Sequence, residues 1–249
     1  MVDQWGPQTP PRLAGYKSWL YQMPCVDSAG DVFVSVSLAG HTELAGDLPT
    51  RWLVALGDVS GRREAASRLK DTLEAGILRL AGTMTDPASI LGALNNDVLD
   101  PDSFACLLVA VIDSIRHELT LANAGSLSPL LRHADRQTKL LGEEITGLPL
   151  WVDPSHTYDE VMVPIGPGEM VIFQSDGVTA VTDDQGCLID LDRLRRTIAQ
   201  APGDAASVGQ SILAAINRFR GGRAQVADIT LLCVRRVVPT TPLGGEASG

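Results

Sequence analysis

The sequence predicts an α+β fold in which two mainly antiparallel β-sheets form a sandwich with helices outside. Strand-like segments follow one another as hairpins, and the helical segments fall into two pairs instead of alternating strictly with strands. With 249 residues and 45% hydrophobic content, the chain is long enough to bury one large core. We therefore predict a single domain at 13–238, with mobile Pro- and Gly-rich tails at 1–12 and 239–249.

The first predicted elements are a hairpin and a helix. Apolar residues alternate with small or polar ones at 31–40 and 51–59, which indicates two antiparallel strands joined by a polar loop at 41–50. A helix is predicted at 63–82, where Gly82 offers a stop. Its apolar residues recur at helical spacing: Leu69, Leu73, Ile77 and Leu80. Such a stripe is typical of core packing, although a regulatory or dimer surface is the alternative.

The remaining elements continue the same pattern. A second helix is predicted at 86–99, with Asp86 as its N-cap and Pro87 in its first turn. Five strands are then predicted, at 104–113, 118–125, 128–134, 159–165 and 169–176. Two further helices, at 190–200 and 204–220, precede a last strand at 228–237.

Charge and hydropathy exclude several classes of function. The formal net charge is −10, and no basic stripe appears in the sequence, which argues against a nucleic-acid partner. The most apolar stretch, 105–112, is far shorter than the roughly 20 residues that cross a bilayer, and the N-terminus has no apolar signal core. We therefore expect a soluble, cytoplasmic protein without a membrane partner.

The cysteines and histidines do not indicate a zinc site. The four cysteines are widely spaced, and three of them lie within or beside apolar runs, which favours buried, reduced thiols over disulfides or a zinc site: Cys25, Cys106, Cys187 and Cys233. None of the four histidines stands in a ligand-like spacing such as HExxH.

Four carboxylates share an unusual placement at the ends of apolar strands. Asp31 and Asp228 each open a strand, whereas Asp58 and Asp176 each end one. If these strand ends converge, the carboxylates would raise each other's pKa unless a cation lay among them, and Mg²⁺ and Mn²⁺ prefer such oxygen ligands. Taken singly, each aspartate could instead be a turn former or helix cap. Ser60 and Ser175 could likewise be simple caps.

Ordered motifs along the chain then point to a known family. They are AGD (29–31), ALGDVSG (55–61), LTLANAG (119–125), TGLPL (146–150), PGEMVIFQSDGVT (167–179) and ADITLLCVRR (227–236). Over about residues 25–236 the sequence resembles the PPM-type, metal-dependent protein serine/threonine phosphatases. It is most similar to their branch of bacterial stage II sporulation protein E and sigma-factor regulatory phosphatases. The resemblance implies an αββα sandwich that hydrolyses phosphoserine or phosphothreonine on a partner protein.

The resemblance also implies a site for two Mn²⁺ or Mg²⁺ ions. Asp58 would bridge both ions, and the Val59 carbonyl would touch one of them. Asp176 would hold the second ion, and Asp31 would act near the first through water. Two cations about 4 Å apart activate a water for in-line attack on phosphorus, so no covalent enzyme intermediate is needed.

The sequence departs from the family pattern at several positions. Val34 stands where the family has a second acidic residue, Ser126 stands where it has histidine, and RREAA replaces a glycine-rich helix start. The largest departure is Ala227, which occupies the position of a metal ligand. Asp228 is the candidate replacement, but neighbouring side chains of a strand face opposite ways.

These departures leave two alternatives to an active protein phosphatase. One is a pseudophosphatase that binds a phosphoprotein or a regulator without hydrolysing it. The other is a metal-dependent phosphohydrolase that acts on small molecules. The partner that the resemblance implies is a STAS-type anti-sigma antagonist or a stress-complex component, bound by a monomer or weak dimer.

Overall fold

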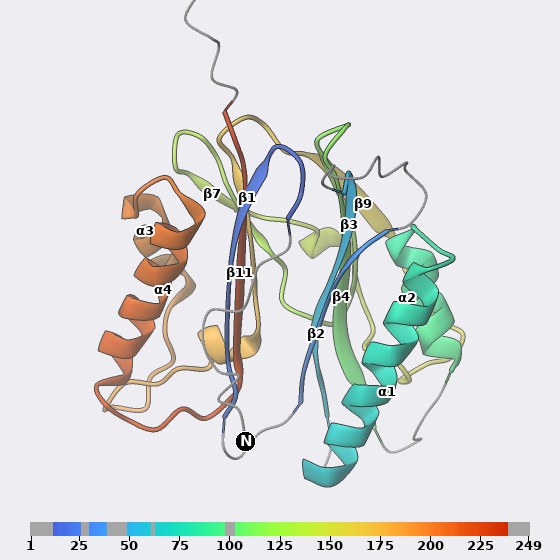
Figure 1. Ribbon diagram of the computed structural model, residues 1–249. Helices are drawn as coiled ribbons and strands as arrows, with labels where there is room; N and C mark the ends of the chain where they lie inside the picture. The colour runs from blue at the N-terminus through green and yellow to red at the C-terminus, as the bar shows by residue number, and fades with distance from the viewer. Residues whose placement is uncertain (1–11, 26–29, 39–48, 61–62, 98–102, 239–249) are drawn as a thin grey trace, which may run out of the picture.

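The computed structural model of the chain describes residues 12–25, 30–38, 49–60, 63–97 and 103–238. Two β-sheets face each other in its centre (Figure 1). The first contains, in spatial order, β1 (Tyr16–Met23), β11 (Ile229–Arg236), β10 (Met170–Gln174), β6 (Leu130–Arg132) and β7 (Thr138–Leu140). The second contains β2 (Asp31–Ser37), β3 (Arg51–Val59), β4 (Ala105–Asp113), β5 (Glu118–Ala124) and β8 (Thr146–Gly147), and β9 (Glu160–Pro164) also pairs with β5. Only the β5–β8 pairing is parallel among the described strands.

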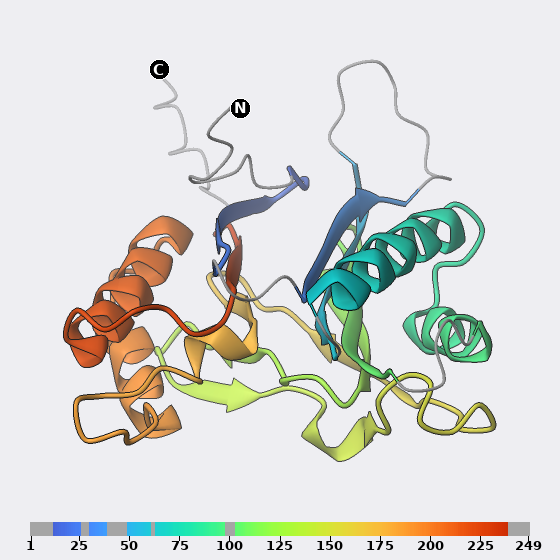
Figure 2. The same cartoon turned by 90° about the horizontal axis from the view of Figure 1, so that it is seen from below.

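A pair of helices covers the outer face of each sheet (Figures 1 and 2). The helices α1 (Arg63–Ala81) and α2 (Pro87–Asn96) pack on the second sheet, and α3 (Leu191–Gln200) and α4 (Ala205–Arg220) pack at the first. This arrangement is an αββα sandwich, which confirms the predicted fold class. No helix in the described part of the chain combines the length and apolar character of a membrane span.

Three apolar layers hold the sandwich together. The middle layer fills the space between the sheets and contains the fully buried Trp52 and Phe173. A second layer lies beneath α1 and α2, and a third lies beneath α3 and α4. The stripe of α1 belongs to the second layer, where Leu73 and Ile77 are almost completely buried. Core packing therefore explains the apolar face of this helix.

Local signals position the helix ends as expected. Asp86 caps α2, because its Oδ1 accepts a hydrogen bond from the Ser89 N–H at 2.6 Å, and Pro87 is the first helical residue. Asp204 caps α4 in the same way, with a 2.8 Å bond from the Ser207 N–H. These side chains satisfy backbone donors that have no partner within the helix.

Some predicted boundaries were wrong. The edge strand β1 was not predicted, and the strand expected at 128–134 contains only Leu130–Arg132. The antiparallel hairpin of β2 and β3 is confirmed, whereas most of its 41–50 loop lies outside the described residues. The expected tails at 1–12 and 239–249 also lie outside them, apart from Arg12. All four cysteines are unpaired, but Cys187 is exposed and not buried.

Candidate functional site

The four aspartates of the sequence analysis meet at one edge of the sandwich. Asp31 and Asp58 lie directly opposite each other in the β2–β3 pairing. Asp176 follows β10 and Asp228 precedes β11, and these two strands are antiparallel, so the end of one lies beside the start of the other. The hydroxyl of Thr230 on β11 donates to Asp31 Oδ2 at 3.0 Å, which joins the edge of one sheet to the edge of the other.

Glycines allow the chain to approach these carboxylates closely. A Cβ atom at Gly30 would overlap Asp58 Oδ1 and would lie 3.0 Å from the Val59 carbonyl oxygen. A Cβ atom at Gly177 would overlap the backbone carbonyl of Asp228. At Gly177 the obstructing atoms are backbone, so a side chain would push the strand ends apart and glycine is required, whereas a side chain at position 30 would displace the Asp58 carboxylate.

Two of the aspartates open onto a common cavity of about 240 Å³. They are Asp58, from the second sheet, and Asp176, from the turn after the first sheet's β10. The rest of the cavity wall consists of Gly57, Cys106, Gly125, Ser126, Leu127 and Ser175. The cavity therefore presents two carboxylates, one from each half of the sandwich, to solvent or to a ligand.

The other two aspartates lie behind this cavity and have protein partners. The Asp228 oxygens accept hydrogen bonds from the backbone N–H groups of Cys25, at 2.6 Å, and Asp31, at 3.3 Å. Asp228 is only 6% exposed and Asp31 only 7%. Asp228 thus fixes the segment after β1 and the start of β2 against the start of β11.

Ala227 occupies the position of a metal ligand in the family pattern, but its surroundings differ from the cavity of Asp58 and Asp176. It lines a separate, much smaller cavity together with Gly177 and Arg220. Its carbonyl oxygen accepts a hydrogen bond from Gln225 Nε2 at 2.7 Å. Neither Ala227 nor Asp228 belongs to the wall of the cavity that Asp58 and Asp176 share.

Burial and mutual repulsion raise the pKa of the clustered carboxyls. Burial, followed by the charge of Asp228, raises the pKa of Asp31 to about 8. Burial, followed by the charge of Asp176, raises the pKa of Asp58 to about 6, and burial also raises the pKa of Asp176. No described Lys or Arg is among the charges that shift these three pKa values. The edge therefore carries negative charge without a cationic side chain to offset it.

The oxygen atoms available as metal ligands at this edge fit a hydrated divalent cation. They are carboxylate oxygens, with the Val59 carbonyl beside Asp58, and such hard oxygen ligands suit Mg²⁺ or Mn²⁺ better than zinc. In the described ranges, no three His, Cys, Asp or Glu side chains are grouped closely enough to hold one ion. A cation held by Asp58 and Asp176 would consequently need several water ligands, which Mg²⁺ commonly keeps.

Two residues at this edge were not predicted to matter. Ser175 was considered as a cap, but it makes no capping hydrogen bond. Its Oγ instead accepts from the Thr230 N–H at 2.9 Å and donates to the Asp228 carbonyl at 3.2 Å. Cys106 was expected to be a buried thiol, but it is only partly buried and lies opposite Asp58 in the β3–β4 pairing. The sequence signal for the role of Ser175 at this edge was its position next to Asp176.

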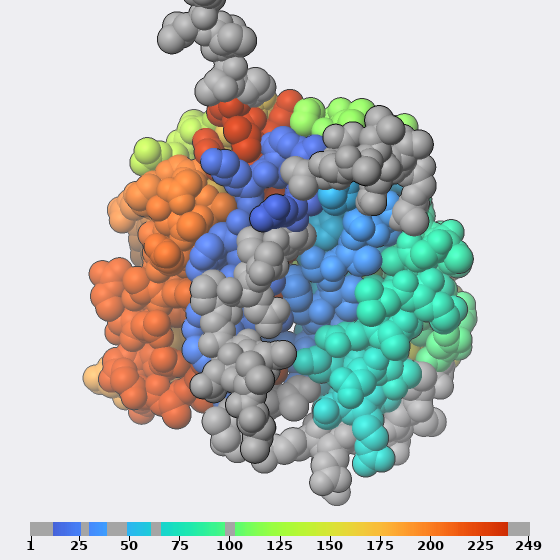
Figure 3. Space-filling model, viewed as in Figure 1, coloured from blue at the N-terminus to red at the C-terminus, as the bar shows by residue number. Residues whose placement is uncertain are grey.

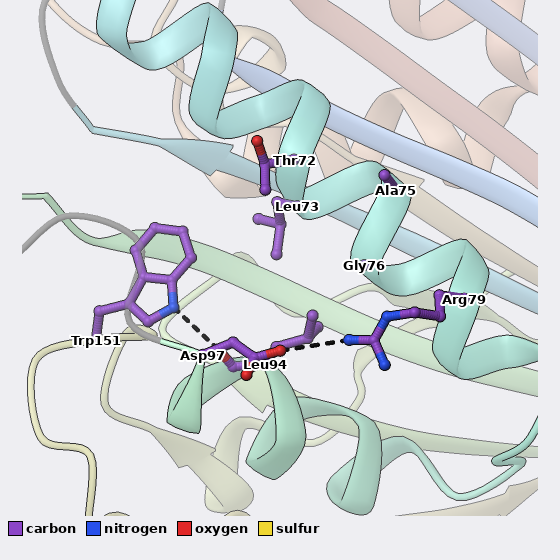
Figure 4. A pocket seen from close by; sticks show the side chains of 8 residues that line it. All are labelled: Thr72, Leu73, Ala75, Gly76, Arg79, Leu94, Asp97 and Trp151. Atoms are coloured by element: carbon purple, nitrogen blue, oxygen red, sulfur yellow. Dashed lines mark hydrogen bonds and ion pairs between the residues drawn. The ribbon is translucent and has the colours of Figure 1, made fainter.

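A second cavity, of about 280 Å³, lies between α1 and α2 (Figure 4). Trp151 forms one wall, where its Nε1 donates to the Leu94 carbonyl at 3.0 Å. Arg79 and Asp97 form a 3.3 Å ion pair that also lines this cavity. The lining is mainly apolar and includes one carboxylate, so this cavity lacks the paired acids of the first one.

The αββα sandwich is the fold of the class of PP2C-type phosphatase domains, and solved structures of that class match the fold of this chain. The RsbU and RsbW domains of a Mycobacterium tuberculosis protein match with a TM-score of 0.74 and 19% identity, over 98% of this chain and 66% of that one. The SiaA-PP2C domain of Pseudomonas aeruginosa matches with a TM-score of 0.67 and 20% identity, over 88% of this chain and 84% of that one. RsbX, solved in complex with magnesium, matches with a TM-score of 0.66 and 13% identity, over 91% of this chain and 98% of that one.

The chain belongs to the family described as stage II sporulation protein E (SpoIIE), which matches residues 49–237. Among curated proteins, phosphoserine phosphatase RsbU of Bacillus subtilis (strain 168) is 23% identical over 188 residues. This match covers 74% of the chain and 56% of RsbU, so the chain spans little more than half the length of that relative.

Proposed function

We propose that this chain is a metal-dependent phosphatase that hydrolyses phosphoserine or phosphothreonine on a regulatory partner protein in bacterial signalling. The observation that carries the proposal is the pair Asp58 and Asp176, which project from the two halves of the sandwich into one cavity. Membership of the SpoIIE family and similarity to the phosphoserine phosphatase RsbU support it. The partner class that we propose is a STAS-type anti-sigma antagonist or a stress-complex component of the cytoplasm. The catalytic unit would be a single domain at 13–238, acting as a monomer or weak dimer.

Each group at the acidic edge has a distinct part in this mechanism. Asp58 and Asp176, with the Val59 carbonyl, would hold Mn²⁺ or Mg²⁺. Bound cations would supply Lewis-acid activation of water and would offset charge on the phosphoryl oxygens. Asp31 and Asp228 would keep the two sheet edges in register behind the cavity, through the bonds with Thr230 and Cys25.

Phosphate release from a phosphoserine-bearing STAS-domain protein, with 2 further substrates as comparison, tests the proposal. We expect turnover that requires Mn²⁺ or Mg²⁺ and falls by about 10³-fold in Asp58→Asn and Asp176→Asn. Asp159→Asn, an exposed aspartate away from the cavity, is the matched control and should retain full activity. The comparison substrates are a phosphothreonine peptide and a nucleotide.

The outcome of this assay also separates the alternatives. Rapid turnover of the nucleotide without turnover of either phosphoprotein or phosphopeptide would indicate a small-molecule phosphohydrolase instead. No turnover of any substrate, with divalent cations and the partner's regulators present, would contradict the phosphatase proposal.

A pseudophosphatase is the second candidate function, and the surroundings of residues 227 and 228 favour it. Ala227 has no side-chain oxygen, and the Asp228 oxygens are engaged by backbone N–H groups. Titration with Mn²⁺ by calorimetry discriminates between the two functions. Two strong sites that disappear in Asp58→Asn would support the enzyme, whereas phosphoprotein binding without any metal binding would support the pseudophosphatase.

A further inference from the structure

Helices α3 and α4 carry a concentration of positive charge in an otherwise acidic chain. Residues 191–223 include six arginines and two aspartates, whereas the whole chain has a formal net charge of −10. The arginines are Arg193, Arg195, Arg196, Arg218, Arg220 and Arg223. They form no continuous stripe in the sequence, but α3 packs beside α4 (orange shades in Figures 1 and 3), and Arg193 and Arg218 line one cavity between the two helices.

The centre of this region is a cavity of about 290 Å³ between the two helices. Arg193 enters it from α3 and Arg218 from α4, and the rest of the wall consists of Thr197, Ala215 and Phe219. We call these five residues the α3–α4 arginine face. The cavity therefore offers two guanidinium groups on opposing helices around an aromatic side chain.

Local contacts hold the two arginines in place. The Arg193 guanidinium carbon lies 4.8 Å from the centroid of the Phe219 ring, a cation–π arrangement. Arg218 Nε donates to the Ala214 carbonyl at 3.2 Å. Within the described residues, the ion pairs of the six arginines are limited to Arg195 with Asp192, at 3.8 Å. Among the described residues, no carboxylate therefore neutralises the charges of Arg193 and Arg218.

We propose that the α3–α4 arginine face docks an acidic segment of a partner protein. A glutamate or aspartate side chain of the partner would enter the cavity and accept hydrogen bonds from both guanidinium groups. Charge-assisted bonds of this kind are stronger than neutral ones, and the guanidinium fork matches the geometry of a carboxylate. The face lies on the outer helix layer of the first sheet, so docking does not require the acidic cavity.

Other polyanions suit this face less well than a protein segment does. A nucleic acid would be repelled by a chain whose net charge is −10, and it binds through a series of phosphates, for which the two-arginine cavity offers too few partners. An anionic membrane would be bound more firmly with apolar side chains inserted beside the arginines. None of the exposed large apolar residues of the described chain lies on α3 or α4.

Fluorescence anisotropy with a labelled 12-residue peptide that contains six glutamates tests this proposal. In 50 mM NaCl we expect binding that a glutamine-substituted peptide does not show and that weakens as salt screens the charges. Arg193→Glu and Arg218→Glu should each weaken binding by about tenfold. Arg116→Glu, an exposed arginine at the β4–β5 turn, makes the same change in net charge and should weaken binding less than twofold.

Several outcomes would overturn the proposal. Equal losses in Arg116→Glu and Arg193→Glu would show a general charge effect, and an absence of glutamate-peptide binding would exclude docking. Tighter binding of a DNA duplex or of phosphatidylglycerol vesicles would assign the face to another polyanion. Sedimentation that shows self-association abolished by Arg218→Glu would assign it to a second copy of the chain.

The phosphatase proposal and this one can fail independently. Asp58→Asn should bind the glutamate peptide as the unmodified chain does, whatever its effect on phosphate release. Thermal melts of the arginine variants serve as the folding control, because both substituted side chains are exposed and should leave the Tm unchanged.

Discussion

The four aspartates at the edge of the sandwich fall into two pairs with opposite surroundings. Asp58 and Asp176 line an open cavity of about 240 Å³. Asp31 and Asp228 lie behind it and are almost completely buried. The Asp31 carboxylate accepts a hydrogen bond from the Thr230 hydroxyl, and the Asp228 carboxylate accepts hydrogen bonds from the backbone N–H groups of Cys25 and Asp31. The same residue type at the same edge thus has two tasks. Asp58 and Asp176 face the cavity, whereas Asp31 and Asp228 make hydrogen bonds that connect the two sheet edges.

Carboxylates that share one edge therefore differ in what their oxygens contact. Asp228 is close enough for its charge to raise the pKa of Asp31 and Asp58. Its oxygens nevertheless face backbone donors, and a carboxylate that accepts such bonds loses them if it turns toward a cation. The orientation of a carboxylate, and not its distance from the cavity, separates the two tasks.

The largest expected effect is on stability, in Asp228→Ala. This change leaves the buried N–H groups of Cys25 and Asp31 without an acceptor, so we expect the free energy of unfolding to fall by about 3 kcal/mol. Asp58→Ala is the matched change in the cavity-lining pair, and it should alter that free energy by less than about 0.5 kcal/mol, because it also relieves repulsion. Urea denaturation of both variants in the presence of a chelator measures the difference.

Equal losses of stability in Asp228→Ala and Asp58→Ala would contradict the structural difference between the buried pair and the cavity-lining pair. Asp159→Ala, at an exposed position, controls for the loss of a carboxylate as such.

A smaller effect is expected on the pH dependence of stability. The pKa of Asp31 is about 8 in the folded protein and near its ordinary value of 3.8 in the unfolded chain. Between these values the folded state binds more protons at Asp31 than the unfolded state does, so the contribution of Asp31 to stability is full below pH 4 and is lost as the pH rises through 8. We expect the Tm of the metal-free protein to fall by about 5 °C between pH 5 and pH 8.5.

Asp31→Asn removes this titration and should flatten the dependence, whereas the exposed control Asp184→Asn should leave it unchanged. A Tm that stays constant or rises over this range in the unmodified chain would contradict the shift. Differential scanning calorimetry at a series of pH values provides the measurement.

The sequence predicted the fold and the convergence of the acids better than it predicted their partners. Helix caps such as Asp86 and the hairpin of β2 and β3 depend on neighbouring residues, so local patterns indicate them. The strand β1 was missed because its burial pattern does not alternate regularly along Tyr16–Met23. The bond between Asp228 and the Cys25 N–H joins residues about 200 positions apart, and only the packing of the sheets reveals it.

Ala227→Asp is expected to have the smallest effect, on the affinity for Mn²⁺, although the resemblance to the family implies a large one. Restoring the acid of the family pattern would increase the affinity for Mn²⁺ if residue 227 faced the cavity of Asp58 and Asp176. In the structure, Ala227 lines the neighbouring small cavity with Arg220, so a new carboxylate there would meet a guanidinium group instead. We therefore expect calorimetry to show Mn²⁺ affinity changed by less than about threefold, with Ala227→Asn as the uncharged control. An increase of tenfold or more in Ala227→Asp alone would mean that the segment before β11 rearranges to supply the ligand, and the division between cavity-lining and buried acids would then depend on the metal.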